Sequence, residues 1–529
     1  MTKNYLFLTI LIFITGLKVF ATDYYVSAIN GNDANNGLSE NTPFKTIQRA
    51  ANLTNPGDTV YVMNGEYTSS WGDTHVVYVT RAGSASNWIT YTNYPNHNPV
   101  IKFTGWGGFQ VKDGAAYIKI NGFIIQGNSD NLNLIDALNQ PGGCNNPNGT
   151  ITATYNGTGI SMMGLNSWST GYVHHIEITN NEVFDCPGGG IGANRSDYIT
   201  IKNNKVYDNC RYNVYGNSGI SLYQNWNYDS NSTTHRMIIE NNYLRGNKGL
   251  VPVTFWGCAY LDGNGIIIDD SRNTQSGSTL GAYTGKTLIR NNVVIGNGGA
   301  GIHIFESDNI DIINNSTYCN QQTPEISTGE INAAQSSNVI VRNNIMYAKS
   351  DKPINISGYY STNILFENNL LFGGNGNFVE GTNSIIANPN YINPTLDENT
   401  DLHINSTSPA IDSGSSILAP SNDFNGNQRP IGNGLDIGAY EYDTTLSIVD
   451  FKPLKIKIYP NPVDDIIIII DLNKKLQSYK IYDLLGKIIV FRKGLKENKI
   501  DISELKSGIY LLELETELGE TAVRKVYKK

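Results

Sequence analysis

A pair of adjacent asparagines recurs through the middle of this 529-residue chain, each time directly after a short run of alternating apolar residues. A period in the twenties with strand-like alternation inside it is typical of a parallel β-helix, in which every coil buries its inward side chains against the coils above and below. The separations between successive pairs are 23, 38, 50, 23, 29 and 25 residues. The seven pairs occupy positions 180–181, 203–204, 241–242, 291–292, 314–315, 343–344 and 368–369.

The asparagine pairs are expected at the same corner of successive coils. Stacked side-chain amides would hydrogen-bond to one another there and satisfy groups that would otherwise be buried unpaired. The two long separations then mark insertions between coils. A β-propeller is the alternative repeat fold, but its blades run to about 40 residues or more and lack such a ladder. Abundant glycine (53 residues) agrees with many short strands joined by tight turns.

The first residues of the chain predict export from the cell. Residues 1–21 combine a positive charge at Lys3, an apolar run over 5–16 and the small-residue end Val19-Phe20-Ala21, which is the pattern of a cleaved signal peptide. A membrane anchor is the alternative, but the apolar run is too short to span a bilayer comfortably. No later stretch is long enough to span a membrane, so the protein is expected outside the cell, secreted or attached to its surface.

Cysteine content and charge exclude some classes of protein. The five cysteines follow no zinc-site spacing. Cys186 and Cys210 lie about one repeat apart and would either pair, stack or serve as small buried apolar side chains. The net charge is −9 and the central region has no run of Lys or Arg, which argues against a nucleic-acid partner.

The segment after the signal peptide predicts a cap for one end of the β-helix. Residues 42–53 place Phe44, Ile47, Ala50 and Ala51 on one face of a short amphipathic helix. Such a helix would close the open end of a solenoid, which otherwise exposes the apolar interior of its first coil.

Three motifs in this region resemble the start of pectate-lyase-like right-handed parallel β-helix proteins, and family nine polysaccharide lyases begin similarly. The motifs are Tyr24-Tyr25-Val26-Ser27, the stretch 43–48 (PFKTIQ) and the stretch 56–62 (PGDTVYV). The resemblance covers roughly residues 22–445 and implies an all-β solenoid that carries the catalytic domain. The superfamily includes lyases, hydrolases and epimerases, and the family pattern of the lyases uses a lysine base, for which this sequence offers no match on the expected face.

The last part of the chain predicts a separate small β-sandwich. After a linker over 446–455, residues 456–529 contain the stretches 457–462 (KIYPNP), 482–487 (YDLLGK) and 505–510 (LKSGIY). These motifs resemble the C-terminal sorting domain of the type IX secretion system, which implies that the secretion machinery is a partner. A carbohydrate-binding module is the alternative, but the tail lacks tryptophan candidates. The stretch 436–442 (DIGAYEY) resembles a motif that closes exported β-helices.

Six strands aligned on a shared start, mostly Gly-Ile, predict which side chains face outward. The position two residues after the aligned isoleucine is always apolar, as an inward column requires. The predicted outward columns contain Ser161, Ser221, His303 and Asn332, and beside them Asn194, Tyr223, Asp269 and Phe305. At the strand ends lie Arg195, Gln224, Asp270, Glu306 and Gln335.

Adjacent coils are about 4.8 Å apart, so these columns gather residues that are distant in sequence. The predicted catalytic residues are Asp269, Asp270, Arg272, His303 and Glu306. The predicted substrate-binding residues are Arg195, Tyr223, Gln224, Trp226, Trp256, Phe305 and Asn332. The predicted calcium ligands are Asp262, Asp269, Asp270 and Glu306, because Ca²⁺ prefers carboxylate oxygens.

Three chemistries fit these residue types. The first is β-elimination on a uronic-acid polysaccharide, which needs a neutralised substrate carboxylate and a base near the sugar C5 proton. The second is glycoside hydrolysis by two carboxylic groups, and the third is C5 epimerisation. A non-catalytic glycan-binding or adhesin-type surface protein would share the fold and the aromatic residues. We expect a monomeric, secreted polysaccharide-degrading enzyme, with the lyase ahead of the hydrolase and calcium as its cofactor.

Overall fold

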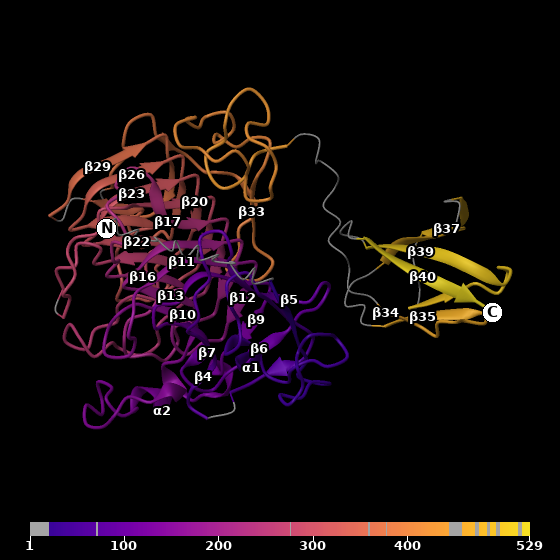
Figure 1. The fold of residues 1–529 in the computed structure, drawn as a ribbon. Helices are drawn as coiled ribbons and strands as arrows, with labels where there is room; N and C mark the ends of the chain where they lie inside the picture. Colours follow the sequence, from indigo (N-terminus) through magenta and orange to yellow (C-terminus); the bar gives the residue numbers. More distant parts are fainter. Residues whose placement is uncertain are drawn as a thin grey trace, which may run out of the picture. The chain divides into compact units, whose positions relative to one another are not determined.

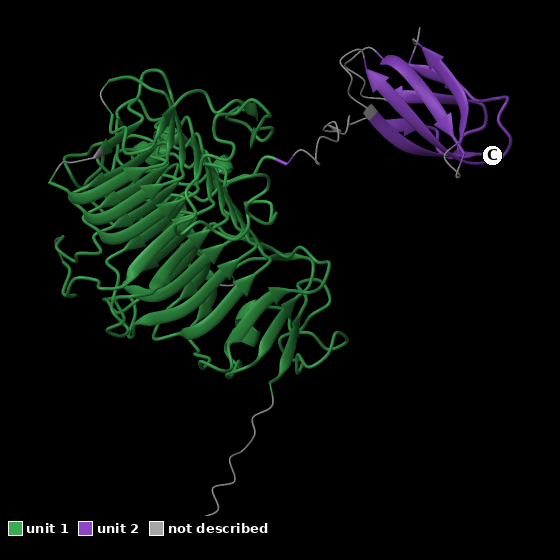
Figure 2. Cartoon of the chain, turned by 90° about the horizontal axis from the view of Figure 1, so that it is seen from above, with its two compact units in different colours: residues 1–442 green, residues 443–529 purple. Residues whose placement is uncertain are grey.

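The structure is a computed structural model that describes residues 21–443, except 70–71, 276, 358–359 and 377, and residues 457–529, except 471–475, 484–486, 494–497 and 517–520. The chain forms two compact units, residues 1–442 and 443–529, shown in green and purple in Figure 2. The expected linker and all but the last residue of the expected signal peptide lie outside the described residues. Within the described residues, no helix has the length and apolar character needed to cross a membrane.

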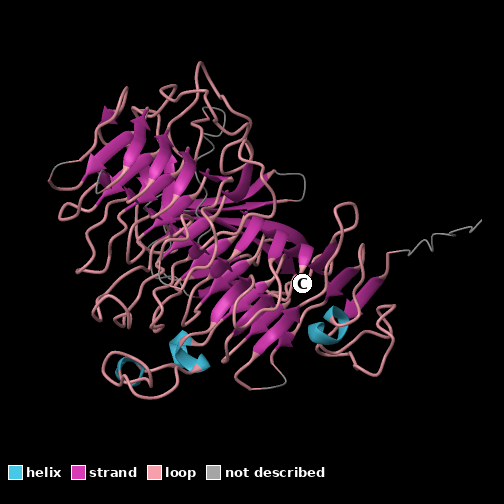
Figure 3. Cartoon of the chain, turned by 60° about the vertical axis from the view of Figure 1, so that its left-hand side comes forward, coloured by secondary structure: helices cyan, strands magenta, loops and turns pink. Residues whose placement is uncertain are grey.

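Unit 1 is a parallel β-helix, and its stacked strands are shown in Figure 1 and, in magenta, in Figure 3. Each coil contributes one strand to each of three parallel sheets. The first sheet consists of β1 (Asp23–Val26), β2 (Thr59–Val62), β5 (Ile89–Asn93), β8 (Ala116–Asn121), β11 (Val173–Thr179), β14 (Ser196–Lys202), β17 (His235–Glu240), β20 (Lys286–Arg290), β23 (Asp308–Ile313), β26 (Ser337–Arg342) and β29 (Thr362–Glu367).

The other two sheets complete the triangular cross-section of the coils. The second sheet consists of β3 (Glu66–Tyr67), β6 (Val100–Lys102), β9 (Ile124–Gln126), β12 (Glu182–Phe184), β15 (Lys205–Tyr207), β18 (Tyr243–Arg245), β21 (Val293–Ile295), β24 (Ser316–Tyr318), β27 (Ile345–Ala348), β30 (Leu370–Gly373) and β31 (Ile385–Ile386). The third sheet consists of β4 (His75–Val79), β7 (Gly107–Val111), β10 (Thr158–Met163), β13 (Ile191–Asn194), β16 (Ile220–Tyr223), β19 (Ile266–Asp269), β22 (Ile302–Phe305), β25 (Ile331–Ala334) and β28 (Asn355–Ser357).

The asparagine pairs have the predicted position at one corner, between the first and second sheets. The first member of each pair has a left-handed backbone, such as φ 54° at Asn291 and at Asn314, which asparagine tolerates. The second member points inward and accepts hydrogen bonds from the amides of the coil before it. Asn315, for example, accepts from the backbone N–H of Asn292 at 2.9 Å and from its Nδ2 at 3.0 Å. This ladder pins the register of successive coils.

A second ladder, which the sequence analysis missed, follows the second sheet. Each member donates both its backbone N–H and its Nδ2 to the Oδ1 of the next, through Asn209, Asn247, Asn297 and Asn320. The ladder ends at the buried carboxylate of Glu330, which accepts from the backbone N–H and Nδ2 of Asn320. Burial raises the pKa of Glu330 to about 8.

The N-terminal cap is present but shorter than predicted. The helix α1 covers only Ile47–Ala51, because Thr46 caps its N-terminus by accepting a hydrogen bond from the backbone N–H of Arg49. The preceding residues are held in a turn by Asp33, which accepts from the backbone N–H groups of Lys45 and Thr46. Phe44 and the predicted apolar face of the helix are buried against the first coil, as expected.

The last part of unit 1 covers the outward side of the second sheet. The hairpin of β32 (Tyr391–Asn393) and β33 (Asp401–Ile404) packs with Ile437, Ala439 and Tyr440 against apolar side chains of that sheet. The stretch 436–442 is fixed here by a buried ion pair, in which Arg429 Nη1 lies 2.6 Å from Glu441 Oε1.

Unit 2 is the predicted small β-sandwich. Its two antiparallel sheets enclose an apolar core that includes Ile467, Ile481, Leu512 and Val526. The sheets consist of β34 (Lys457–Tyr459), β35 (Ile466–Ile470) and β38 (Lys499–Asp501), and of β36 (Leu476–Tyr482), β37 (Ile488–Lys493), β39 (Gly508–Thr516) and β40 (Thr521–Lys528).

Candidate functional site on the third sheet

Loops border the outward face of the third sheet on both edges. Long insertions enter its strands from the second sheet, over 127–157, 208–219 and 246–265, and other loops leave toward the first sheet, over 164–172, 224–234 and 270–285. The first insertion contains η1 (Ser129–Asn131), α2 (Leu134–Leu138) and η2 (Ala153–Tyr155). The three incoming insertions share a small apolar core that includes Ala137, Tyr212, Val214 and Val251.

A disulfide joins two of these insertions. Cys144 is bonded to Cys258, and the two cysteines are 114 positions apart in sequence. Of the alternatives for Cys186 and Cys210, the disulfide does not form, because both are free and buried, as small apolar side chains would be. The disulfide therefore braces the loops beside the site instead of the solenoid interior.

The inward and outward columns have the predicted register. The inward residues, including Ile266, Ile268 and Ile304, are fully buried. Pairing between neighbouring strands places His303 between Ile267 and Asn332, and Asp269 between Tyr223 and Phe305. Asp269 and His303 therefore lie on adjacent strands and on the same outward face, as the sequence predicted.

Asp269 is tied to a loop residue that sequence reasoning missed. Gln275, in the loop after β19, donates from Nε2 to Asp269 Oδ1 at 2.7 Å. The hydroxyl of Tyr223 donates to Gln275 Oε1 at 3.4 Å. Burial and, second, the negative charge of Asp262 raise the pKa of Asp269 to about 8. Burial, followed by the charges of Asp269 and Asp270, raises the pKa of Tyr223 to about 12.

Asp262 supplies a second carboxyl group, whose negative charge acts on Asp269. It lies in the loop that enters β19, and Asn264 donates from Nδ2 to its Oδ1 at 3.1 Å. Burial raises the pKa of Asp262 to about 7, although the hydrogen bond from Asn264 opposes the shift. Two carboxyl groups with raised pKa values therefore interact at the edge of the outward face, and such pairs are common where acid and base chemistry is needed.

The next two coils continue the face with His303, Phe305 and Asn332. His303 Nε2 and Asn332 Oδ1 are buried and have no hydrogen-bond partner in the described structure. The ring of Phe305 contacts His303 edge to face, with 5.9 Å between ring centroids. Burial lowers the pKa of His303 to about 4, so the imidazole is neutral near pH 7.

The structure corrects the roles predicted for three residues at the strand ends. Arg195 donates to Gln224 Oε1 and to the carbonyls of Leu165 and Gly277, so it ties three loops together. Gln224 in turn donates to Asp270 Oδ2 at 3.0 Å.

The carboxylate of Asp270 also accepts from the backbone N–H groups of Thr274 and Gln275. Asp270 is fully buried. All three residues have left-handed backbones at the same corner. They hold the loops in place, and the geometry does not support catalysis or calcium binding by Asp270 or substrate binding by Arg195 and Gln224.

Arg272 and Glu306 also differ from expectation. Arg272 binds Asp308 with Nε and Nη2 and Ser337 with Nη2, so its guanidinium is held beside the first sheet and not on the third. Glu306 lies at the corner after β22, and its Oε2 is buried without a hydrogen-bond partner in the described structure. Among the described residues, Glu306 Oε2 therefore has no partner, whereas the guanidinium of Arg272 is paired.

The two predicted tryptophans have different surroundings. Trp226 stacks on Tyr172 with ring centroids 4.2 Å apart, and both lie in loops that leave the third sheet. Trp256 is 73% exposed in the disulfide-bonded insertion on the other edge. The loop with Trp226 is anchored by a buried cluster that sequence reasoning missed, in which Arg236 and the hydroxyl of Tyr283 both contact Asp197.

The four predicted calcium ligands do not fit one ion. Among the residues that the structure describes, no three His, Cys, Asp or Glu side chains gather as metal ligands. The oxygens of Asp270 are occupied by loop hydrogen bonds. Asp262 and Asp269 remain as two carboxyl groups, and no step of the proposed reaction uses calcium. Calcium dependence stays a prediction that chelation tests.

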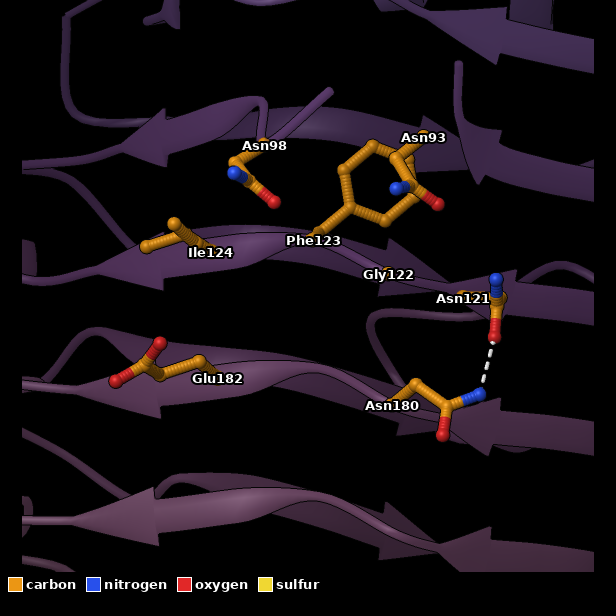
Figure 4. A pocket seen from close by; sticks show the side chains of 8 residues that line it. All are labelled: Asn93, Asn98, Asn121, Gly122, Phe123, Ile124, Asn180 and Glu182. Carbon is orange, nitrogen blue, oxygen red and sulfur yellow. Dashed lines mark hydrogen bonds between the residues drawn. The ribbon is translucent and has the colours of Figure 1, made fainter. Parts of the chain in front are cut away.

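A hollow of about 450 Å³ lies elsewhere, at the corner between the first and second sheets. Figure 4 shows its lining, which includes Asn93, Asn121, Asn180 and Glu182. Its amides are engaged with one another: Asn180 donates to Asn121 Oδ1 at 2.7 Å. The hollow marks the start of the asparagine ladder and lies away from the third sheet.

Comparison with known proteins identifies the fold family. The model of the "Pel9A-like, right handed beta helix region" matches residues 24–344, more than half of the chain. The chain belongs to the Pel9A-like right-handed β-helix family. A solved structure of pectate lyase Pel9A covers 80% of this Pel9A-like chain and 96% of its own, with 16% identity and a TM-score of 0.47. A lacto-N-biosidase structure from Eubacterium ramulus covers 66% of this chain and 60% of its own, with 14% identity and a TM-score of 0.45.

Two curated proteins match parts of this Pel9A-like chain. Lacto-N-biosidase of Bifidobacterium longum subsp. longum is 24% identical over 347 residues, which is 50% of this chain and 21% of that protein. β-Agarase D of Zobellia galactanivorans is 37% identical over 75 residues, 14% of each chain. The matches therefore span about a fifth and a seventh of the two relatives.

The tail of the Pel9A-like chain has its own match. The model of the secretion system C-terminal sorting domain covers residues 457–529, which is the β-sandwich of unit 2. The sequence resemblance in the tail is thereby confirmed. The protein is secreted or displayed on the cell surface, and its fold is related to those of carbohydrate-active enzymes.

Proposed function

We propose that unit 1 is a carbohydrate-active enzyme that hydrolyses a glycosidic bond with the carboxyl pair of Asp262 and Asp269. The observation that carries the proposal is the raised pKa of both groups, about 7 for Asp262 in the loop that enters β19 and about 8 for Asp269 on the outward face of the third sheet. Near neutral pH such a pair retains about one proton. Glycoside hydrolysis needs one protonated and one ionised carboxyl group at the scissile bond.

The two carboxyl groups have different roles because they share about one proton. The protonated carboxyl group donates to the leaving glycosidic oxygen, and the ionised group either attacks the sugar carbon or activates a water molecule. Gln275 orients Asp269 through the 2.7 Å hydrogen bond to Oδ1, which leaves the other carboxylate oxygen to the substrate. Asn264 does the same for Asp262. Tyr223 and Phe305, which pair with Asp269 on either side, are placed to contact the sugar rings.

β-Elimination on an acidic polysaccharide is the second candidate. Membership of the Pel9A-like right-handed β-helix family favours β-elimination. The base would then be His303, which is neutral and has an unpartnered Nε2, or Tyr223. Arg272 is engaged with Asp308. C5 epimerisation would use the same groups, and a non-catalytic glycan-binding protein would not require the carboxyl pair.

The decisive experiment measures products from a panel of glycans. Purified protein is incubated with pectate, alginate, xylan, agarose and an oligosaccharide that ends in lacto-N-biose, with and without EDTA. New reducing ends without absorbance near 235 nm indicate hydrolysis, whereas that absorbance indicates elimination. Loss of activity with EDTA would support calcium. No product from any glycan would favour a binding protein and contradict the proposal.

Matched variants test the carboxyl pair. Asp262→Asn and Asp269→Asn should each lower kcat by about 10³-fold or more, because general acid–base groups contribute about 10² to 10⁴. Asp351→Asn is the control, since Asp351 is a largely exposed carboxylate in the loop between β27 and β28. Full activity in either site variant would remove the pair from the mechanism.

The proposal also includes how the protein is exported, what it acts on and whether it is a monomer. The sorting domain supports passage through the type IX secretion machinery, which is then a partner of unit 2. A polysaccharide or oligosaccharide outside the cell is the substrate. That the protein is a monomer stays a prediction, and light scattering on the purified protein tests this oligomeric state.

A further inference from the structure

We propose that Tyr228 and the aromatic residues that it contacts form a second glycan-binding site, separate from the carboxyl pair, on the first sheet. Tyr228 lies in the loop 224–234, which runs from β16 to β17. Its side chain is 42% exposed, and the rings that it contacts include two from the strands β11 and β14. The ligand is a neutral polysaccharide, with one sugar ring against the exposed side of Tyr228.

Three aromatic rings of the first sheet stack on one another across successive coils. The ring of His175 lies between those of Tyr117 and Tyr198, with centroids 4.6 and 4.3 Å away and interplanar angles of 26° and 8°. All three residues, called the aromatic column, are partly exposed. Each directly precedes one of the register partners Ile118, Ile176 and Ile199. The column is therefore fixed by the pairing of β8, β11 and β14.

The later coils of the same sheet have asparagine where the aromatic column has rings. Strand pairing through β17 and β20 carries the position of Tyr198 to Asn309 in β23. Asn338 and Asn363 follow, and each donates from Nδ2 to Oδ1 of the asparagine before it, at 3.2 and 2.8 Å. The backbone is left-handed throughout, with φ of 57°, 56° and 53° at the three rings and 61°, 58° and 54° at the three asparagines.

The left-handed backbone suits asparagine and strains an aromatic residue. Asparagine adopts this conformation readily because its short side chain bonds locally, whereas a bulky residue there is an outlier. One stacked contact between rings is no stronger than the strain of one such residue, and three rings have only two stacked contacts. Strained residues gather at sites that bind ligands. The presence of rings where asparagine fits therefore supports a role in binding.

Tyr228 is held in position without a ligand. Its backbone N–H donates to Oδ2 of the buried Asp197 at 2.8 Å. Its ring meets those of His175 and Tyr198 at 82° and 90°, with centroids 5.1 and 6.0 Å away, and lies 4.1 Å from the ring of His174. A ring that is already fixed loses little conformational freedom when a sugar binds.

The polar groups beside Tyr228 suit sugar hydroxyls. His174 and His175 contact each other through their Nδ1 atoms at 2.7 Å. Burial lowers the pKa of His174 to about 4 and also lowers the pKa of His175, so both imidazoles are neutral near pH 7. A neutral imidazole has one nitrogen that donates and one that accepts. An aromatic surface with a few polar groups beside it is typical of sites for small polar ligands.

The charges around this surface are already paired. Arg236 is fully buried, and its guanidinium lies 3.1 Å from Asp197 Oδ2 and 2.8 Å from Asp229 Oδ1. The hydroxyl of Tyr198 also donates to Asp229, at 2.8 Å. An acidic polymer needs a cation that is not already engaged. The surroundings of Tyr228 therefore favour a neutral glycan.

Binding is measured with the full-length Asp269→Asn protein, which keeps cleavage from removing the glycan. Agarose beads and insoluble xylan are the neutral probes, and calcium pectate and calcium alginate gels are the acidic ones. Depletion of the protein from solution gives the dissociation constant. We expect binding to agarose or xylan. Binding confined to the acidic gels, or to none of these materials, would overturn the proposal. The readout needs no turnover, so a failed test of hydrolysis leaves it valid.

Variants of Tyr228 locate the binding surface. In the Asp269→Asn protein, Tyr228→Ala should weaken binding by about 10-fold or more, and Tyr228→Phe, which keeps the ring, should stay within about 3-fold. Leu396→Ala is the matched control, since Leu396 is 45% exposed and lies between β32 and β33, over the second sheet. Equal affinity of the alanine variant of Tyr228 and its parent would overturn the assignment.

The strain in the aromatic column has a test of its own. His175→Asn places in the column the residue that the later coils use. We expect Tm to stay within about 3 °C of the parent, because relieved backbone strain offsets the lost stacking, while binding to the same glycan weakens by about 5-fold or more. A larger fall in Tm would show that the column serves stability alone, and unchanged affinity would remove it from the site. Either result would overturn its role in binding.

Discussion

Gln275 donates a 2.7 Å hydrogen bond from Nε2 to Oδ1 of Asp269, and this contact joins the loop after β19 to the outward face of the third sheet. The loop is itself held by Asp270, which accepts from the backbone N–H groups of Thr274 and Gln275. Two adjacent aspartates thus have separate tasks. Asp269 faces the site, and Asp270 fixes the residue that orients Asp269.

The first prediction concerns the alkaline limit of activity. The hydrogen bond from Gln275 lowers the pKa of Asp269 and so opposes the effects of burial and of Asp262. Gln275→Ala removes that contribution, and the alkaline limb of the kcat/KM profile should move to higher pH while kcat falls about 10-fold from lost orientation. Gln126→Ala, in a strand of the second sheet, is the control. An unchanged pH profile in the Gln275 variant would contradict the assigned contact.

The second prediction concerns stability against pH. The pKa of Asp269 is about 8 in the folded protein, above the unfolded value, so its contribution to the free energy of unfolding is present in acid and is lost as pH rises toward 8. The free energy of unfolding of Asp269→Asn should therefore exceed that of the wild type by more at pH 9 than at pH 4. The change in this difference should be on the order of 1–3 kcal/mol. Denaturant unfolding of both proteins across this range measures it. Parallel curves would show that Asp269 is not shifted.

The third prediction separates Asp270 from the catalytic groups. Asp270→Ala leaves the side chain of Gln224 and two backbone N–H groups without their acceptor. We expect a loss of about 1–3 kcal/mol in unfolding free energy and faster hydrogen exchange over 271–285. Asp270→Asn, which keeps an acceptor oxygen, should recover part of the stability. Wild-type stability in the alanine variant, together with complete loss of activity, would restore the catalytic role.

The fourth prediction concerns the asparagine ladder. Asn315 accepts from Asn292 and donates to Asn344 Oδ1 and to the carbonyl of Ile289, all in the interior. Asn315→Ala breaks these contacts and should cost about 2–4 kcal/mol, since several buried groups lose partners. Asn148→Ala, at an exposed loop position, is the control and should change stability by less than about 0.5 kcal/mol. Thermal and denaturant unfolding measure both.

Much of the fold follows from sequence because a solenoid is built from local repeats. The asparagine pairs predicted both the period and the corner, and the alternation around Ile266 and Ile302 predicted which side chains face inward. The second ladder was missed because single asparagines, such as Asn247 and Asn297, lie among glycines in segments that resemble ordinary turns. The predicted helix is too long at its N-terminus because the apolar periodicity already includes Phe44. The residue that caps the helix, Thr46, comes after that position.

The candidate site was predicted only in part. Asp269, His303, Phe305 and Asn332 lie on the predicted face, because the two-residue period of a strand decides their direction. Arg195, Gln224 and Asp270 are predicted at the site because they end the aligned strands, but a left-handed corner turns all three into the loops. Arg272, two residues further on, is held by Asp308. Gln275 was missed because a loop residue has no periodicity that reveals where it points.

The sequence by itself determined the winding of the chain, the direction of each strand residue and the sorting tail, because these depend on short repeats and on motifs whose parts are close together. Only the tertiary structure decided which polar side chains are free. The insertions fold back over the third sheet, where the Cys144–Cys258 disulfide and the contacts of Arg195 and Asp270 fix them. Burial raises the pKa values of Asp262 and Asp269, and burial is a property of distant segments packed together.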